Sequence, residues 1–275
     1  MLSYERTLCM TDCMISEYLE LLDCADCREK NVENLCRLQR AHLEKIPYNN
    51  FDIYFSGIVP ALDEESLFEK IVRQKRGGYC FELNGLYTQL LRALGYQVEE
   101  YFARWHFGGC DPLPMRRHRI CKVVCEGKSF ISDVSIGSAG SVIPFDFEFD
   151  KIQSRRVRDY RFIRDEKLGV LLEAMSGNAW VPYYSFTTDP HFPLDFEYAN
   201  FYCARYADSI FRKKFFMHRQ SEDIQYYIED LQQPGVPFNF CIRKSQNDIE
   251  KIAVRNQSHL TDILNQFFSF SPRCS

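Results

Sequence analysis

Several features that would define other classes of protein are missing from this sequence. Its 275 residues contain no apolar run long enough to span a bilayer, which excludes a transmembrane helix. The stretch at residues 1–14 lacks the basic-then-apolar pattern of a secretory signal, so we expect a cytoplasmic protein. The formal net charge of −4 gives no basic field that would hold nucleic acid non-specifically. We therefore expect neither a membrane nor a nucleic acid as partner.

A complete set of metal ligands is also missing. The sequence has twelve cysteines, and without a secretion signal we expect reduced thiols rather than a disulfide framework. The single Cys-x-x-Cys motif runs from Cys24 to Cys27, and no second motif or Cys/His pair at ligand spacing completes four ligands. The sequence therefore predicts no bound metal ion.

The spacing of apolar residues divides the chain into three portions. Residues 1–95 show helical spacing, residues 96–200 show the alternation of strands, and residues 201–275 mix the two patterns. We expect Pro182 and the two prolines that follow it in loops rather than in central strands, because proline cannot donate a ladder hydrogen bond. With 45% apolar and 26% charged residues, the composition fits a globular protein with a large core. The pattern predicts an α+β fold.

The stretch at residues 76–85, RGGYCFELNG, is the one that suggests chemistry. Gly77 and Gly78 allow backbone angles closed to other residues, and an amphipathic helix begins directly after them. Cys80 would lie in the first turn of that helix, where unpaired N–H groups and the helix dipole favour a thiolate. The alternative is a small buried cysteine that only packs.

A cysteine nucleophile needs a histidine as base and a group that orients the histidine. The turn at Glu126 and Gly127 can close a hairpin with a two- or four-residue loop. In such a hairpin, a residue of the first strand and a residue of the second strand point to the same face when their numbers sum to an odd value. His118 and Asp133 satisfy this rule, whereas a three-residue loop would put them on opposite faces. The order Cys80, His118, Asp133 is that of papain-like enzymes in general form. Protease, acyltransferase and transglutaminase chemistry remain open at this point.

These residues resemble the arylamine N-acetyltransferase family. The resemblance rests most specifically on RGGYCFELNGLY at residues 76–87, and it continues in the family's order through ARW at 103–105, DVSIG at 133–137 and WVPYYSF at 180–186. It implies three packed portions: a helical bundle over residues 1–95, a β-barrel over residues 96–200 and an α/β lid over residues 201–275.

The resemblance also implies a reaction. Acetyl-CoA would be the co-substrate, with no metal, and a small aromatic amine or hydrazine would be the acceptor, in the manner of xenobiotic metabolism. The acetyl group would pass through Cys80 in two half-reactions, with His118 as general base and later acid and Asp133 as its orienter.

The family's substrate contacts map onto four further positions. The resemblance implies that Trp105 and Ile136 line the acceptor pocket and that Gly137 and Ser209 lie on the coenzyme side.

Three departures from the family pattern affect these expectations. Asn49 stands where the family usually has a glutamate that pairs with the arginine matching Arg76, so we expect a hydrogen bond there instead of an ion pair. Ile136 stands where the family has a pocket-lining aromatic residue, and Trp105 stands where a smaller residue is usual. Ala204 and Arg205 replace residues whose hydroxyls lie near the coenzyme. An alternative is therefore an acyltransferase or amide synthase of the same scaffold that uses a different acyl donor.

Overall fold

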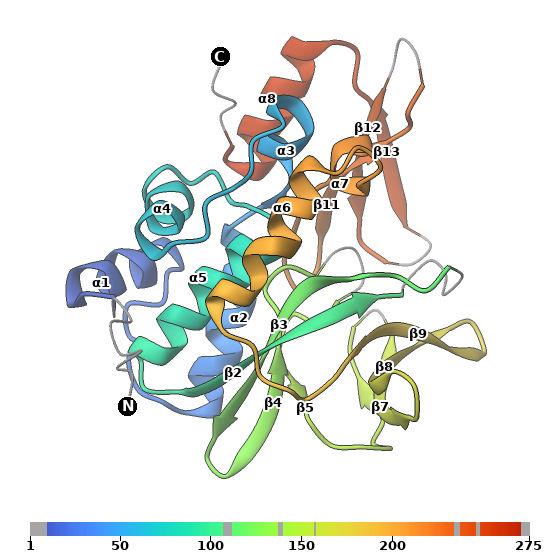
Figure 1. Ribbon diagram of the computed structural model, residues 1–275. Helices are drawn as coiled ribbons and strands as arrows, with labels where there is room; N and C mark the ends of the chain where they lie inside the picture. Colours follow the sequence, from blue (N-terminus) through green and yellow to red (C-terminus); the bar gives the residue numbers. More distant parts are fainter. Residues whose placement is uncertain are drawn as a thin grey trace.

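The hydrophobic residues of this chain gather in three cores. A computed structural model describes residues 10–106, 112–136, 140–156, 158–233, 237–245 and 248–270. One core lies among the N-terminal helices, the second inside a large antiparallel sheet, and the third between a smaller sheet and the last helix. Figure 1 shows the same division, with the large sheet below and the smaller sheet at the upper right. This arrangement confirms the predicted α+β fold.

The N-terminal portion is helical, and its helices begin where polar side chains cap them. Thr11 and Asn31 accept hydrogen bonds from the backbone of the first turns of the first two helices, as N-caps do. The elements are α1 (Asp12–Leu21), α2 (Val32–Lys45), α3 (Phe51–Ser56), α4 (Glu64–Phe68), a π-helical turn (Glu69–Arg73) and α5 (Cys80–Ala93).

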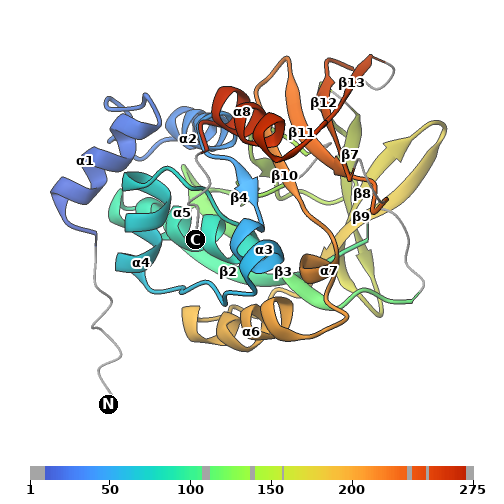
Figure 2. The same cartoon turned by 90° about the horizontal axis from the view of Figure 1, so that it is seen from above.

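The helix α5 is the centre of this portion. Eleven of its fourteen residues are buried, so it is covered on nearly every side rather than on one face. Figures 1 and 2 show it between α4 and the strands β2 and β3 of the large sheet. The first residue of α5 is therefore held between the helices and the sheet.

The large sheet has eight antiparallel strands in the order β5-β4-β3-β2-β9-β8-β7-β6. Its two edge strands are joined by one side chain, because the amide of Gln153 both accepts from the backbone N–H of Asp146 at 2.9 Å and donates to its carbonyl at 2.8 Å. The sheet thus nearly closes into a barrel. The strands are β2 (Gln97–Trp105), β3 (Arg116–Cys125), β4 (Lys128–Ser132), β5 (Phe145–Asp146), β6 (Gln153–Ser154), β7 (Asp159–Asp165), β8 (Gly169–Ser176) and β9 (Ala179–Phe186).

The expectation of a loop at Pro182 is wrong, because this residue lies within β9 between β2 and β8. The β2–β9 ladder stops at Tyr184, before it reaches Pro182. On the other side, the β8–β9 register shifts between Leu172 and Glu173, directly opposite Pro182. A bulge and an end of pairing are the places where a strand tolerates proline.

The C-terminal portion packs one helix against a smaller antiparallel sheet of order β1-β10-β11-β12-β13. Its edge strand β1 comes from the N-terminal portion, so these two portions share a sheet. The expected boundary after residue 95 falls between α5 and β2, and that after residue 200 falls inside α6. The elements are β1 (Tyr48–Asn49), a 3-10 turn (Pro193–Phe196), α6 (Glu197–Arg205), α7 (Ile210–Lys213), β10 (Met217–Gln220), β11 (Gln225–Asp230), β12 (Phe238–Arg243), β13 (Ile249–Ala253) and α8 (Gln257–Phe268).

No helix in the described part of the chain has the length and apolar character needed to cross a membrane.

Candidate active site

The backbone that leads into α5 requires its two glycines. Gly77 has a φ of +59°, and a Cβ atom added there would lie 1.9 Å from the carbonyl oxygen of Pro47. A Cβ atom on Gly78 would lie 2.9 Å from the Glu82 side chain. That side chain accepts a hydrogen bond from the backbone N–H of Tyr79 at 3.1 Å, which fixes the first turn. Cys80 is consequently the first residue of α5, as the sequence predicts.

The hairpin that carries the other two residues has the predicted register. Glu126 and Gly127 both have positive φ angles and form a two-residue loop between β3 and β4. His118 lies on β3, and Asp133 follows the last residue of β4. The two side chains meet on one face, with Nε2 of His118 at 2.5 Å from Oδ2 of Asp133. The geometric expectation for this pair is confirmed.

Three hydrogen bonds hold the second oxygen of Asp133. Its Oδ1 accepts from Nδ2 of Asn84 at 2.8 Å, from the backbone N–H of Ser135 at 2.8 Å and from the Ser135 hydroxyl at 2.9 Å. Burial opposes the carboxylate form, but the charge of His118 and these hydrogen bonds outweigh it and lower the pKa of Asp133. Asp133 is therefore an oriented carboxylate.

Sequence reasoning did not assign a role to Asn84 or Ser135. Asn84 is four residues after Cys80, so it lies on the same face of α5 one turn further on. A polar side chain at that position of a buried helix is the signal that could have identified it.

His118 links this carboxylate to the thiol. Cys80 interacts with His118 electrostatically, and because Nε2 faces Asp133, the ring nitrogen left for the thiol is Nδ1. Burial disfavours the charged imidazole, but the Asp133 carboxylate and the contact with Cys80 raise the pKa of His118 to about 10. The Cys80 thiol also lies 3.6 Å from the carbonyl oxygen of Arg117. Cys80, His118 and Asp133 are 2%, 7% and 2% exposed, so the three form a buried group.

The expected acceptor residues lie on the barrel side of this group. The ring of Trp105 is edge-on to His118 with 5.7 Å between centroids, and it also packs on Tyr183 at 4.8 Å. Ile136 is buried in the barrel core, three residues after Asp133. The structure thus brings Trp105 to the histidine and keeps Ile136 in the loop that carries the aspartate.

Of the two expected coenzyme residues, the structure describes only Ser209. Gly137 lies outside the described residues. The hydroxyl of Ser209 caps α7 by accepting from the backbone N–H of Phe211 at 3.3 Å, and this side chain is buried.

An open cleft is lined by α6 and by residues at the start of β3. It has a volume of about 530 Å³ and includes Arg117, whose carbonyl oxygen faces Cys80. Tyr198 and Phe201 on α6 are 68% and 60% exposed there, which is unusual for large aromatic side chains. The lining consists of Met115, Arg116, Arg117, Tyr198, Ala199, Phe201, Tyr202, Arg205 and Tyr206.

The expected contact between Asn49 and Arg76 takes a different form. The Asn49 amide donates to the carbonyl oxygen of Arg76 at 2.9 Å. The guanidinium of Arg76 forms an ion pair with Asp52 at 2.5 Å, and Lys70 joins the same carboxylate at 2.8 Å. Arg76 therefore keeps an ion pair, formed with Asp52 of α3 instead of with residue 49.

His42 and His218 lie outside the group of Cys80, His118 and Asp133, and each contacts a tyrosine. His42 bonds to the Tyr18 hydroxyl at 2.8 Å, and burial lowers its pKa to about 3, so its role is structural as expected. His218 stacks on Tyr48 with 4.4 Å between ring centroids. Within the described ranges, no three His, Cys, Asp or Glu side chains are grouped so that they could hold a metal ion.

Comparisons with known proteins relate nearly the whole chain to one family. A family model described as N-acetyltransferase matches residues 31–271. An arylamine N-acetyltransferase of Mycolicibacterium smegmatis is 34% identical over 175 residues, which span 62% of this chain and 63% of that protein. The arylamine N-acetyltransferase / N-hydroxyarylamine O-acetyltransferase of Salmonella typhimurium is 31% identical over 206 residues, which span 75% of this chain and 73% of that protein.

Solved structures show the same relationship. The arylamine N-acetyltransferase from Salmonella typhimurium superposes with a TM-score of 0.84 at 28% identity, covering 95% of this chain and 92% of that one. The Mycobacterium marinum arylamine N-acetyltransferase in complex with CoA gives 0.82 at 25% identity, covering 93% and 92%. From its sequence and its fold, this chain belongs to the arylamine N-acetyltransferase family of enzymes.

Proposed function

We propose that this protein transfers an acetyl group from acetyl-CoA to a small aromatic amine or hydrazine through an acetyl-cysteine. The observation that supports this most strongly is the buried chain of contacts from Cys80 through His118 to Asp133. A cysteine at a helix start beside an imidazolium is the arrangement that makes a thiol nucleophilic.

In the first half-reaction the Cys80 thiolate attacks the thioester carbonyl. The tetrahedral intermediate collapses, the bond to the coenzyme sulfur breaks, and His118 gives its proton to that leaving thiolate. Coenzyme A leaves, and Cys80 carries the acetyl group.

In the second half-reaction the acceptor nitrogen attacks the acetyl carbonyl. His118, now neutral, takes a proton from this nitrogen, and the Cys80 thiolate leaves. Asp133 accepts a hydrogen bond from Nε2 of His118 throughout, so that Nδ1 stays directed at the thiol.

The burial of the group supports a covalent intermediate. Exclusion of water protects an acetyl-cysteine beside a general base from hydrolysis, and the three side chains are almost completely enclosed. The nine described cysteines, Cys80 included, are free thiols, and we infer a reducing compartment such as the cytoplasm.

The open cleft supports a nucleotide-bearing donor. Its arginines Arg116, Arg117 and Arg205 can pair with phosphates, and its exposed aromatic rings offer stacking surfaces to a purine. Coenzyme A has both groups, and the solved relative from Mycobacterium marinum is described in complex with CoA. The thioester end of such a donor would then lie at Cys80.

One observation favours a different donor on the same scaffold. Ala204 and Arg205 occupy the positions where the resemblance implies hydroxyl groups near the coenzyme, and neither side chain carries a hydroxyl. Ala204 is buried and Arg205 lines the cleft. An amide synthase or an acyltransferase with another thioester is the second candidate.

Mass spectrometry of the intact protein after incubation with acetyl-CoA tests the proposal. We expect an adduct of one acetyl group on the peptide that contains Cys80, release of one equivalent of free coenzyme, and loss of the adduct when an arylamine is added. A Cys80→Ala variant should give no adduct. Absence of the adduct in the folded wild-type protein would favour the second candidate.

A further inference from the structure

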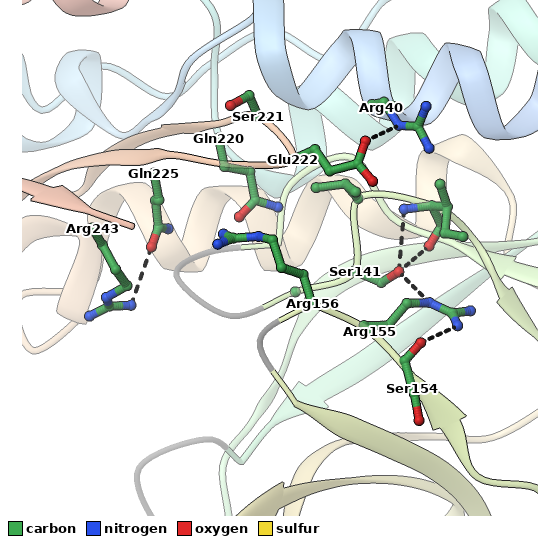
Figure 3. A pocket seen from close by; sticks show the side chains of 13 residues that line it. Arg40, Ser141, Ser154, Arg155, Arg156, Gln220, Ser221, Glu222, Gln225 and Arg243 are labelled. Atoms are coloured by element: carbon green, nitrogen blue, oxygen red, sulfur yellow. Dashed lines mark hydrogen bonds and ion pairs between the residues drawn. The ribbon is translucent and has the colours of Figure 1, made fainter. Parts of the chain in front are cut away.

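A second cavity lies between α2, the large sheet and the smaller sheet. It is enclosed by α2, residues 140–143, residues 154–156 and the strands β10 to β12, with a volume of about 210 Å³ (Figure 3). Its lining shares no residue with the open cleft at α6. The cavity is therefore separate from the site described above.

Positive charge dominates the described lining of this cavity. The charged residues of the lining are four arginines and one carboxylate, which give a net charge of +3. They are Arg40, Arg155, Arg156, Arg243 and Glu222. Glu222 lies 3.7 Å from Nε of Arg40, at the rim. Arginine stays charged at any pH that leaves a protein folded. A cavity of this kind attracts anions.

The guanidinium groups are held in place by neutral oxygens. Arg155 donates from Nε to the Ser141 hydroxyl at 2.9 Å, and Arg156 donates from Nη1 to the carbonyl of Lys244 at 2.8 Å. Arg243 donates to the Tyr227 hydroxyl at 3.3 Å and lies over that ring. These contacts are made to neutral oxygens, so they leave the positive charge at the cavity wall. Arg155 uses Nε, Nη1 and Nη2 in contacts with protein oxygens, so it contributes charge rather than donors.

Two buried glutamine amides add directed donors. Gln220 and Gln225 are 5% and 2% exposed, and Nε2 of each has no hydrogen-bond acceptor among the described residues. Figure 3 shows the side chains of Gln220 and Arg156 directed toward one another from opposite walls. The orientation of the Gln225 amide is fixed, because Arg243 donates to its Oε1 at 3.2 Å. Buried donors normally have acceptors, so these two point to one supplied by a ligand.

The size of the cavity limits the ligand. Pockets for drug-sized molecules measure about 300–1,000 Å³, and 210 Å³ is smaller than that range. Guanidinium groups pair through two parallel hydrogen bonds with phosphate and with carboxylate. A phosphoryl group brings nearly two negative charges and three acceptor oxygens, which suits a net charge of +3 better than a single carboxylate does. We propose that this cavity binds one or two phosphoryl groups, either of free phosphate or diphosphate or of a larger molecule whose remainder lies outside.

The wall of this cavity also contacts residues next to Asp133 in the catalytic group. Gln39 donates to the carbonyl of Ser141 at 3.2 Å, and its Oε1 accepts from the Ser132 hydroxyl at 2.6 Å, one residue before Asp133. A Cβ atom on Gly140 would lie 1.9 Å from Ile136. The phosphate site and the catalytic group therefore share a packed wall although they share no lining residue.

Titration calorimetry with inorganic diphosphate at low ionic strength tests the proposal on the full chain. We expect saturable binding at one site, weakened at least about tenfold in Arg156→Gln and in Arg243→Gln and less in Arg243→Lys, which keeps the charge but not the paired donors. Arg156 is exposed, so its replacement leaves the three cores intact. The matched control is Arg28→Gln, an exposed arginine outside the cavity, which should bind diphosphate as the wild type does.

Two results would overturn the proposal: no saturable binding to the wild-type protein, or equal weakening in the Arg28 control and the cavity variants. A second titration, of coenzyme A with diphosphate already bound, identifies the source of the phosphate. Competition, with both ligands weakened by Arg156→Gln, assigns the site to phosphates of the coenzyme; independent binding assigns it to a free phosphate. Both support a phosphate site, and neither depends on acyl transfer.

Discussion

The two sides of Cys80 are built in opposite ways. On the barrel side, the carboxylate of Asp133 accepts four hydrogen bonds and is almost completely buried. On the α6 side, the cleft is open and lined by exposed aromatic rings and arginines. The chemistry requires one fixed geometry, whereas a donor can be held by several combinations of charge and stacking. We therefore expect changes on the barrel side to affect rate and changes on the cleft side to affect donor affinity.

The largest effect is expected from Asp133→Asn. An amide at this position can donate to Nε2 of His118 and so hold the ring in the wrong tautomer. We expect kcat/KM to fall by about a thousandfold to ten-thousandfold, measured by release of free coenzyme. Asp146→Asn, a carboxylate change on β5 outside the triad, is the control. A well-folded Asp133→Asn variant with wild-type kinetics would show that the carboxylate has no orienting role.

A smaller loss is expected from Asn84→Ala. It removes the hydrogen bond to the buried carboxylate, worth about 1.5–3 kcal/mol, or roughly tenfold to a hundredfold in rate. It also removes the contacts of this amide with Arg119, Val134 and Ser135, which hold the same loop. The fall should appear in kcat, with KM for the donor unchanged, because Asn84 does not line the cleft. Thr88→Ala is the matched control, since Thr88 is a buried polar residue of the same helix that bonds only within α5. Equal losses in both variants would indicate a general packing effect.

Trp105→Val tests the acceptor side. Removing the indole beside His118 should widen the pocket and improve kcat/KM for bulkier amines relative to aniline-sized ones, by about 1–3 kcal/mol of discrimination. The measurement is the ranking of a panel of arylamines. If all acceptors decline together and the melting temperature falls, Trp105 only packs against Tyr183 and the barrel core.

The smallest effect is expected on the cleft side, from Arg205→Ala. The exposed guanidinium is screened by solvent, so KM for acetyl-CoA should rise only roughly threefold to tenfold, and less at high salt, with kcat unchanged. Arg28→Ala, an exposed arginine outside the cleft lining, removes the same charge and serves as the control. A fall in kcat with unchanged KM would contradict the division between the two sides.

The same contrast explains what the sequence could predict. Cys80 is identified by local signals, because the glycine pair and the helix start are adjacent in the chain. The pairing of His118 with Asp133 follows from the parity of a two-residue hairpin. Both inferences need only short-range geometry.

What the sequence could not show depends on contacts between distant segments. Arg40 and Arg243 meet at one cavity although some 200 positions separate them. Pro182 enters a central strand only because the β2–β9 ladder ends before it. The ion pair of Arg76 moves to Asp52, a choice that no spacing rule fixes.

The pH dependence of Cys80 alkylation tests the central claim most directly. The pKa of His118, raised to about 10, keeps the imidazolium beside the thiol from acidic pH up to that value. Iodoacetamide should therefore modify Cys80 rapidly at about pH 6, well below the ordinary thiol pKa of roughly 8.5, while the exposed Cys13 of the same molecule serves as internal reference. In His118→Gln the Cys80 rate should fall to that of an ordinary thiol. If wild-type Cys80 reacts only as the pH approaches 8.5, and His118→Gln leaves its rate unchanged, then no thiolate–imidazolium pair exists in this protein.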